Sequence, residues 1–130
     1  MKIVIGDCMY DVIIIGAGPA GISAGLYAKR ANLNVLILYH GISGVEKAHK
    51  IENYYGFPGG ISGKELYNNG IEQAKSLGIE VLEEEILNIE NNLDLIYTVK
   101  SKNKKFESKA LIIATGTKKI KPNIERYRRI

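Results

Sequence analysis

Cysteine is nearly absent from this 130-residue sequence, in which Cys8 is the only one. An internal disulfide, a Cys-x-x-Cys redox centre and a cysteine-rich zinc site each need at least one more thiolate, so all three are excluded within this chain. The sequence also lacks an apolar run of about 18 residues, the minimum for a membrane-spanning helix, and it lacks the pattern of a signal peptide. We therefore expect a soluble, cytoplasmic chain with no membrane contact and no metal site.

The remaining composition is ordinary, with 45% hydrophobic and 25% charged residues, which suits one core in one domain. The net charge of +4 is unevenly placed, because from Lys100 onward eleven Lys and Arg face two acids, Glu107 and Glu125. A basic segment can bind nucleic acid, but few aromatic residues accompany these lysines. A solvated basic surface is the favoured interpretation, so we expect no nucleic-acid partner.

The most informative stretch is DVIIIGAGPAG, residues 11–21, in which four apolar residues lead into G-x-G-x-x-G. A buried-strand pattern precedes it and a helix pattern follows, which is the context that the dinucleotide fingerprint requires. Gly16 permits the tight turn, Gly18 lets the backbone approach a pyrophosphate, and Gly21 lets helix and strand pack closely. Pro19 suits the first helical position. The pattern predicts a dinucleotide at the helix N-terminus; a glycine-rich turn without a ligand is the alternative.

A β-α-β unit is predicted around this fingerprint. Residues 10–15 form a continuously apolar strand, residues 19–31 a helix with a stripe of small residues, and residues 35–38 a second parallel strand. A carboxylate is expected at the end of that second strand to hold a ribose hydroxyl, but Tyr39 and His40 stand there. His40 could donate to a ribose oxygen or a phosphate, although a lone histidine at a strand end is more often a surface residue.

The rest of the chain predicts a mixed α/β architecture. Residues 41–60 form a long connection whose aromatic, carboxylate and amide side chains suit a planar ligand. Ser62 and Glu65 read as a capping box that starts a helix ending near Leu77, with Leu66, Ile71, Ala74 and Leu77 facing inward. A third parallel strand (79–82), a three-stranded antiparallel meander (85–90, 95–100 and 105–107) and a buried parallel strand (110–114) follow. The fold class is therefore α/β, with a parallel sheet, helices and a meander.

These residues resemble a known family, the low-molecular-weight thioredoxin reductases and related FAD-dependent pyridine nucleotide-disulfide oxidoreductases. The resemblance covers residues 9–116 in three ordered blocks: DVIIIGAGPAGISAGLYAKRANLNVLIL, KIENYYGFPGGISGKEL and ALIIATG. Residues 50–63 are similar to clostridial-type variants, in which a longer segment such as GVEKA (residues 44–48) replaces the usual Gly-Gly-Gln.

The resemblance implies a Rossmann-like FAD-binding domain over residues 9–117, preceded by an extension (1–8) and followed by a basic tail (118–130). It implies Asn53 near the isoalloxazine and Ile86 near the adenine. Tyr39 and His40 lie where the ribose contact is expected. The pyrophosphate turn and the loop passing the cofactor supply the other candidates: Gly16, Ala17, Gly18, Pro19, Ala20, Gly21, Ala114, Thr115 and Gly116.

Several features that follow the matched blocks in that family are not in this sequence: a second glycine-rich turn for the pyridine nucleotide, a Cys-x-x-Cys pair and the later Gly-Asp motif that completes the FAD domain. The chain therefore looks like the first half of a split FAD domain, truncated, with no catalytic residues of its own and inactive alone. Its expected partners are FAD and the missing remainder of the protein or a homodimer partner. A thioredoxin-like substrate is expected only for a full-length parent.

Three functions stay open at this point. The leading one is an FAD-binding segment of a thioredoxin-reductase-like flavoenzyme, whose parent moves electrons from a reduced donor through FAD to a disulfide. The second is a non-catalytic FAD-binding or interaction module. The third, a single-domain NAD(P)-binding protein, is disfavoured because no acid–base constellation can be identified in the sequence.

Overall fold

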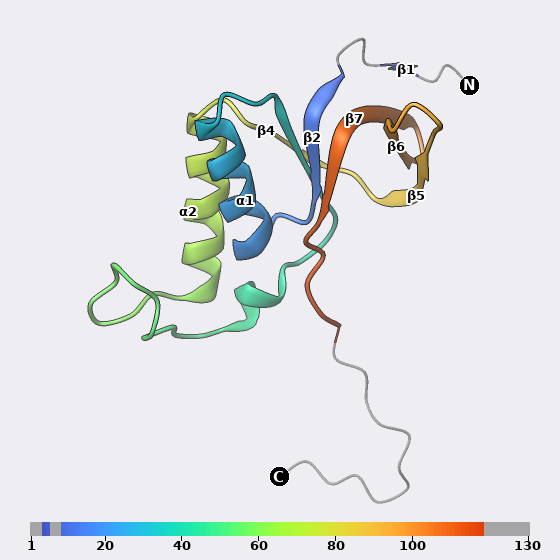
Figure 1. The fold of residues 1–130 in the computed structure, drawn as a ribbon. Helices are drawn as coiled ribbons and strands as arrows, with labels where there is room; N and C mark the ends of the chain where they lie inside the picture. Colours follow the sequence, from blue (N-terminus) through green and yellow to red (C-terminus); the bar gives the residue numbers. More distant parts are fainter. Residues whose placement is uncertain (1–3, 6–8, 119–130) are drawn as a thin grey trace, which may run out of the picture.

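The computed structural model describes residues 4–5 and 9–118 of the chain (Figure 1). Its elements in chain order are β1 (Val4–Ile5), β2 (Tyr10–Ile15), α1 (Pro19–Arg30), β3 (Val35–Tyr39), the 3₁₀ turn η1 (Gly44–Lys47), α2 (Gly63–Ser76), β4 (Glu80–Glu83), β5 (Ile86–Asn91), β6 (Tyr97–Ser101) and β7 (Lys104–Ile113). No helix in this part of the chain is long and apolar enough to span a membrane.

The strands form one mixed sheet in the order β4-β3-β2-β7-β6-β5, and β1 pairs with the start of β7. β4, β3, β2 and β7 are parallel neighbours, whereas β5, β6 and β7 are antiparallel. β7 therefore belongs to both parts: its first half pairs with β6, and residues from Ser108 onward pair with β2. The meander and the parallel sheet are continuous through this one strand.

The sequence predicts two separate strands where the structure has β7 alone, and that prediction is wrong. The polar residues between the two apolar runs suggest a break, yet Ser108 is fully buried. Its hydroxyl donates to the carbonyl oxygen of Ala110 at 2.7 Å. A buried polar side chain costs little once it is hydrogen-bonded, so the strand continues through it.

Two hydrophobic clusters lie on opposite faces of the parallel strands, because successive side chains of a strand point to opposite sides. One face contacts α1 and α2, and the other contacts the meander. Figure 1 shows both helices on one side of the sheet. The helix face carries Val12, Ile14, Val35 and Ile37; the meander face carries Ile13, Ile15, Leu36 and Leu38. The predicted α/β class, with its Rossmann-like β2-α1-β3 unit and three layers, is confirmed.

α1 packs closely on the preceding turn and on the sheet. A Cβ atom on Gly21 would stand 1.8 Å from the carbonyl oxygen of Gly16, and one on Gly25 would stand 2.8 Å from Cδ1 of Ile37. The predicted stripe of small residues therefore packs as expected at these two positions. The helix ends at Arg30, with Ala31 as its C-cap residue.

α2 begins at the predicted place, where the hydroxyl of Ser62 accepts a hydrogen bond from the backbone N–H of Glu65 at 3.1 Å. The prediction that Leu77 faces inward is wrong, since 47% of it is exposed. The reason is that α2 ends at Ser76 and Leu77 is the C-cap residue, so it no longer follows the helical period. Ala74 and Ile79, on either side, are buried instead.

The two ends of the chain are described only in part. In the predicted N-terminal extension, Val4 and Ile5 pair in parallel with Lys104 and Lys105 of β7. The predicted basic tail lies outside the described residues except for Lys118. The domain boundaries at residues 8 and 117 stay predictions.

Candidate dinucleotide site

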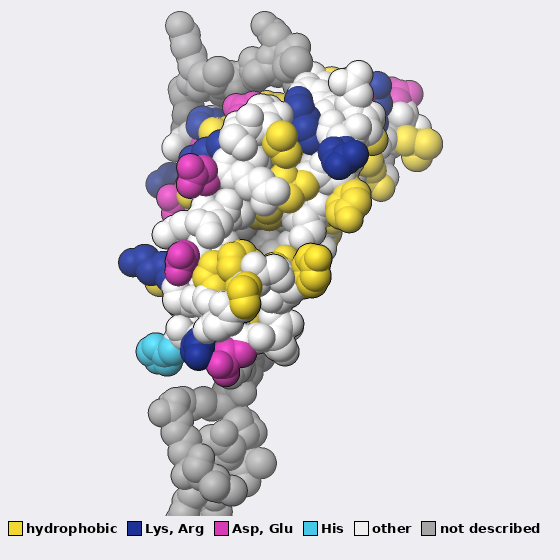
Figure 2. Space-filling view, turned by 90° about the vertical axis from the view of Figure 1, so that its left-hand side faces the viewer, with side chains coloured by type: hydrophobic (Ala, Val, Ile, Leu, Met, Phe, Trp, Pro, Cys, Tyr) yellow, Lys and Arg dark blue, Asp and Glu magenta, His cyan; other side chains and the backbone are white. Residues whose placement is uncertain are grey.

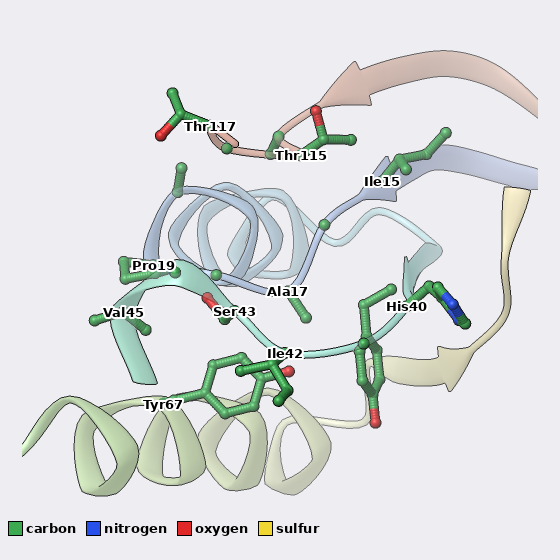
Figure 3. Close-up of a pocket in the computed structure, with 18 of the residues that line it drawn as sticks. Ile15, Ala17, Pro19, His40, Ile42, Ser43, Val45, Tyr67, Thr115 and Thr117 are labelled. Atoms are coloured by element: carbon green, nitrogen blue, oxygen red, sulfur yellow. The ribbon is translucent and has the colours of Figure 1, made fainter. Parts of the chain in front are cut away.

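A cavity of about 590 Å³ lies at the carboxyl ends of the parallel strands (Figure 3). It is lined by residues 15–20 from the end of β2 into α1, residues 39–45 from the end of β3 into η1, residues 84–86 before and within β5, and residues 114–117 after β7, together with Tyr67 of α2. In open α/β sheets, ligands bind in the crevice outside the carboxyl ends of the strands. The position of the cavity therefore agrees with the position of the sequence fingerprint.

Most of the predicted site residues line this cavity: Gly16, Ala17, Gly18, Pro19, Ala20, Tyr39, His40, Ile86, Ala114, Thr115 and Gly116. Gly21 and Asn53 are not among its lining residues. Gly21 packs beneath the turn, against the backbone of Gly16. Asn53 lies in a loop closed by the bridge between Ile51 and Ile61. Cofactor contact by any of these residues stays a prediction.

Gly16 joins three strand ends below the cavity. Its φ angle is +114°, and a Cβ atom there would lie 2.1 Å from the carbonyl oxygen of Ala114. Its N–H donates to the carbonyl oxygen of Leu38 at 2.7 Å, while the N–H of Ala114 donates to Ile15 at 2.8 Å. Only glycine combines this backbone conformation with so close an approach.

The N-terminus of α1 opens onto the cavity without a cap from the protein. Its N-cap residue is Gly18, which has no side chain, and its first turn contains Pro19 and no acidic residue. The first hydrogen bond within the helix runs from Ile22 N–H to Gly18 at 3.0 Å, so the amides of Ala20 and Gly21 have no partner within the helix. Free amides and the positive end of the helix dipole together favour a phosphate group.

Ser43 and η1 form one wall of the cavity, which was not predicted from the sequence. Ser43 and Glu46 form a capping box at η1, in which the Ser43 N–H donates to Oε1 of Glu46 at 2.7 Å. η1 in turn lies against the start of α2, because the Gly63 N–H donates to Ala48 at 2.8 Å and a Cβ atom on Gly63 would lie 1.8 Å from the carbonyl oxygen of Val45. The spacing Ser-x-x-Glu at residues 43–46 is the sequence signal that could have identified this turn.

The ionisable groups of the cavity are few. Burial, followed by the nearby Tyr39, Glu46 and Glu83, raises the pKa of Tyr67 to about 12, so its hydroxyl is neutral at pH 7. The hydrogen bond from the Lys104 ammonium lowers the pKa of Glu84, and the two form an ion pair at 2.7 Å. His40 and Glu85 also line the cavity, whereas none of the lining residues in the described part of the chain is Lys or Arg.

The aromatic loop after η1 faces a second, smaller cavity. Tyr54 and Phe57, with ring centroids 6.0 Å apart, line a space of about 180 Å³ between α1 and α2. Figure 2 looks onto this helix side and shows apolar side chains gathered there among charged ones. Gly18 and Pro19 line both cavities. The aromatic side chains predicted to contact a planar ligand therefore lie on the far side of the glycine turn.

A metal site and a nucleic-acid-binding surface can also be examined in the described residues. In residues 4–5 and 9–118, no group of three His, Cys, Asp or Glu side chains is placed to hold a metal ion. Four lysines of the basic segment form ion pairs, namely Lys100–Glu90, Lys104–Glu84, Lys105–Glu107 and Lys109–Asp11. Pairing with carboxylates reduces the positive potential that nucleic acid would need.

Comparison with protein-family models identifies the family of this chain. The family model described as pyridine nucleotide-disulphide oxidoreductase matches residues 10–128. The chain belongs to this family.

Its relatives in this oxidoreductase family include thioredoxin reductases. The chain is 44% identical over 116 residues to the thioredoxin reductase of Aquifex aeolicus (strain VF5), covering 85% of this chain and 35% of that protein. It is 43% identical over 110 residues to the thioredoxin reductase of Bacillus subtilis (strain 168), covering 83% and 34%. The chain thus spans about a third of the length of these curated relatives.

Solved structures agree with the sequence relatives. The thioredoxin reductase of Lactococcus lactis superposes with a TM-score of 0.81 at 36% identity, over 88% of this chain and 38% of that chain. The thioredoxin reductase from Streptococcus pyogenes MGAS5005 gives a TM-score of 0.81 at 38% identity, over 92% and 39%. The resemblance stated from the sequence motifs is confirmed.

Proposed function

We propose that this chain binds FAD in the 590 Å³ cavity, as the FAD-binding segment of a thioredoxin-reductase-like oxidoreductase. The observation that carries the proposal is the start of α1, where a glycine fingerprint leaves helix amides facing the cavity with no side-chain cap and no acid. Such a helix start suits a pyrophosphate. The relatives named above are thioredoxin reductases, which supports a flavin dinucleotide over other ligands.

Three groups of cavity residues would contact different parts of FAD. The turn from Gly16 to Ala20 would hold the pyrophosphate, and the absence of a side chain at Gly18 leaves the turn open to it. Tyr39, His40 and Ile86, at the ends of β3 and the start of β5, would contact the adenosine half. Ala114, Thr115 and Gly116 would pass beside the cofactor after β7. FAD, once bound, supplies the redox chemistry, while the chain binds it and orients it.

The same cavity argues against a dinucleotide with a 2′-phosphate. Such a phosphate is usually accommodated by an arginine near the end of the second strand, whereas the lining residues within 9–118, the end of β3 included, contain no Lys or Arg. The third candidate from the sequence, a single-domain NAD(P)-binding protein, is therefore weakened for NADP(H), while NAD(H) is left to the titration below.

The redox function is proposed for a longer protein. In it, electrons would pass from a reduced donor through FAD to a disulfide, with a thioredoxin-like protein as the disulfide partner. A redox disulfide needs two thiols, and this sequence has one cysteine, so the thiol pair must come from elsewhere. We expect the 130-residue chain alone not to catalyse NADPH-dependent disulfide reduction. A cytoplasmic location stays a prediction from composition.

The test is a set of titrations of the purified chain with FAD, NADH and NADPH, followed by flavin fluorescence and by absorption spectra. We expect saturable FAD binding with a shifted flavin spectrum, and no saturable binding of NADPH at the same concentrations. Saturable binding of NADPH, with FAD unbound, would overturn the proposal and favour the nicotinamide alternative.

A further inference from the structure

We propose that Ser43 adds a phosphate contact to those of the α1 turn: its hydroxyl donates a hydrogen bond to the pyrophosphate from the loop beside that turn. This inference rests on the proposed function, since it names a contact for the same dinucleotide. The sequence fingerprint does not include Ser43, which lies 22 residues beyond Gly21 in a connection between β3 and α2.

The Ser43 side chain lies in the cavity beside the α1 turn. Ser43 lines the main cavity, and Figure 3 shows its oxygen directed toward the turn beside Pro19. A Cβ atom on Gly18 would lie 3.2 Å from Oγ of Ser43. The hydroxyl therefore stands at the position where the turn has no side chain, close to the amides that face the cavity.

The hydrogen bonding of Ser43 is the second argument. In the capping box with Glu46, the glutamate accepts from the serine N–H, and the Glu46 N–H donates to the serine carbonyl oxygen at 3.2 Å. A hydroxyl group carries one proton, and among the described residues the Ser43 hydroxyl donates it to no protein acceptor, so the proton is available. A proton donor held at this place suits an anionic oxygen.

The Ser43 backbone is held in place before a ligand binds, and the cavity around it has little positive charge. The capping box fixes the Ser43 backbone, and η1 is fixed on Gly63 of α2 through Val45 and Ala48. A donor held in place before binding loses little conformational entropy when the ligand arrives. Among the described residues no Lys or Arg lines the cavity, so a neutral donor such as the Ser43 hydroxyl adds a phosphate contact that no cation of this part of the chain supplies.

The experiment uses substitutions that separate capping from phosphate contact. Ser43→Ala removes both the cap and the donor and should weaken FAD binding about ten-fold, the usual size for a hydrogen bond to a charged group. Ser43→Asp keeps a preferred N-cap acceptor but replaces the donor by a negative charge. It should weaken FAD binding by about 100-fold or more while leaving the urea midpoint close to that of the parent chain.

Ser62→Asp is the matched control, because it makes the same exchange at the N-cap of α2, outside the cavity lining. It should bind FAD as the parent does. Riboflavin, which has no phosphate, should bind the Ser43→Asp and parent chains equally.

The results separate two failures. If the parent binds FAD and Ser43→Asp binds it equally well, Ser43 is only a capping residue and this inference is wrong while the proposed function stands. If the parent does not bind FAD, both are wrong.

Discussion

The two α-helices within residues 9–118 cover the same face of the sheet but begin in different ways. α2 starts at Ser62, whose hydroxyl caps the helix, and Glu65 places a carboxylate in its first turn. α1 starts at Gly18, with no side-chain cap and no acid in its first turn, and it opens onto the main cavity. The protein therefore satisfies the start of α2 with its own side chains and leaves the start of α1 without a side-chain cap. A residue change at each start should affect different properties.

The largest effect is expected from Gly16→Ala, which attacks the turn before α1. The new Cβ atom would lie 2.1 Å from the Ala114 carbonyl oxygen, at a φ of +114°. Backbone strain and overpacking together should lower the free energy of unfolding by about 3 kcal/mol or more. Urea unfolding measures it, with Gly44→Ala as control because a Cβ there meets nothing within 4 Å. Equal urea midpoints for the two variants would contradict the account.

Gly18→Val should leave the fold intact and abolish tight FAD binding. Gly18 has an extended backbone with φ of −71°, and a Cβ there meets only Oγ of Ser43 at 3.2 Å. The branched side chain would occupy the space that the pyrophosphate needs, so affinity should fall about 100-fold or more. Fluorescence titration with FAD measures this, with Ser23→Val further along α1 as control. An unchanged FAD affinity would remove the turn from the site.

Ser62→Ala should show the reverse pattern at the start of α2. Loss of the hydrogen bond to the Glu65 amide should lower the free energy of unfolding by about 1 kcal/mol. FAD affinity should be unchanged, because Ser62 does not line the cavity. Urea unfolding and FAD titration on the same preparation test both halves; a loss of affinity without a loss of stability would contradict the comparison.

The smallest effect is expected from Glu84→Gln at the cavity rim. Lys104 holds the pKa of Glu84 below its ordinary value in the folded chain. The pair therefore contributes stability above the unfolded-state pKa, and this contribution is lost as pH falls through the lower folded-state pKa. The contribution should be below about 1 kcal/mol. Comparing urea unfolding of the parent and the variant at pH 7 and pH 3, we expect the difference to shrink at pH 3; a constant difference would exclude a role for ionisation.

The sequence predicts the elements whose patterns are local. β2, α1 and β3 follow from an apolar run, a glycine fingerprint and the small residues Gly21 and Gly25, and the start of α2 follows from Ser62. Tertiary contacts decide the rest. β7 continues through buried Ser108, whose hydroxyl is hydrogen-bonded. In the sequence this polar residue suggests a break between two strands.

The candidate site divides in the same way. The turn residues could be predicted because the G-x-G-x-x-G spacing between a strand and a helix is itself the signal for a dinucleotide-binding turn. Ser43, Tyr67 and Glu84 could not, because η1, α2 and β4 come together at the cavity only in the folded chain. Asn53 shows the converse: it stands in a motif shared with the family, yet its loop does not line the main cavity.

The most direct test of a phosphate site at the start of α1 is competition against FAD bound to the parent chain. ADP carries the pyrophosphate and the adenosine, whereas riboflavin carries only the isoalloxazine and its ribityl chain. We expect ADP to displace FAD, measured by recovery of flavin fluorescence, and riboflavin at the same concentration not to displace it. Displacement by riboflavin with none by ADP would contradict this expectation, because binding would then depend on the flavin and not on the turn at Gly18.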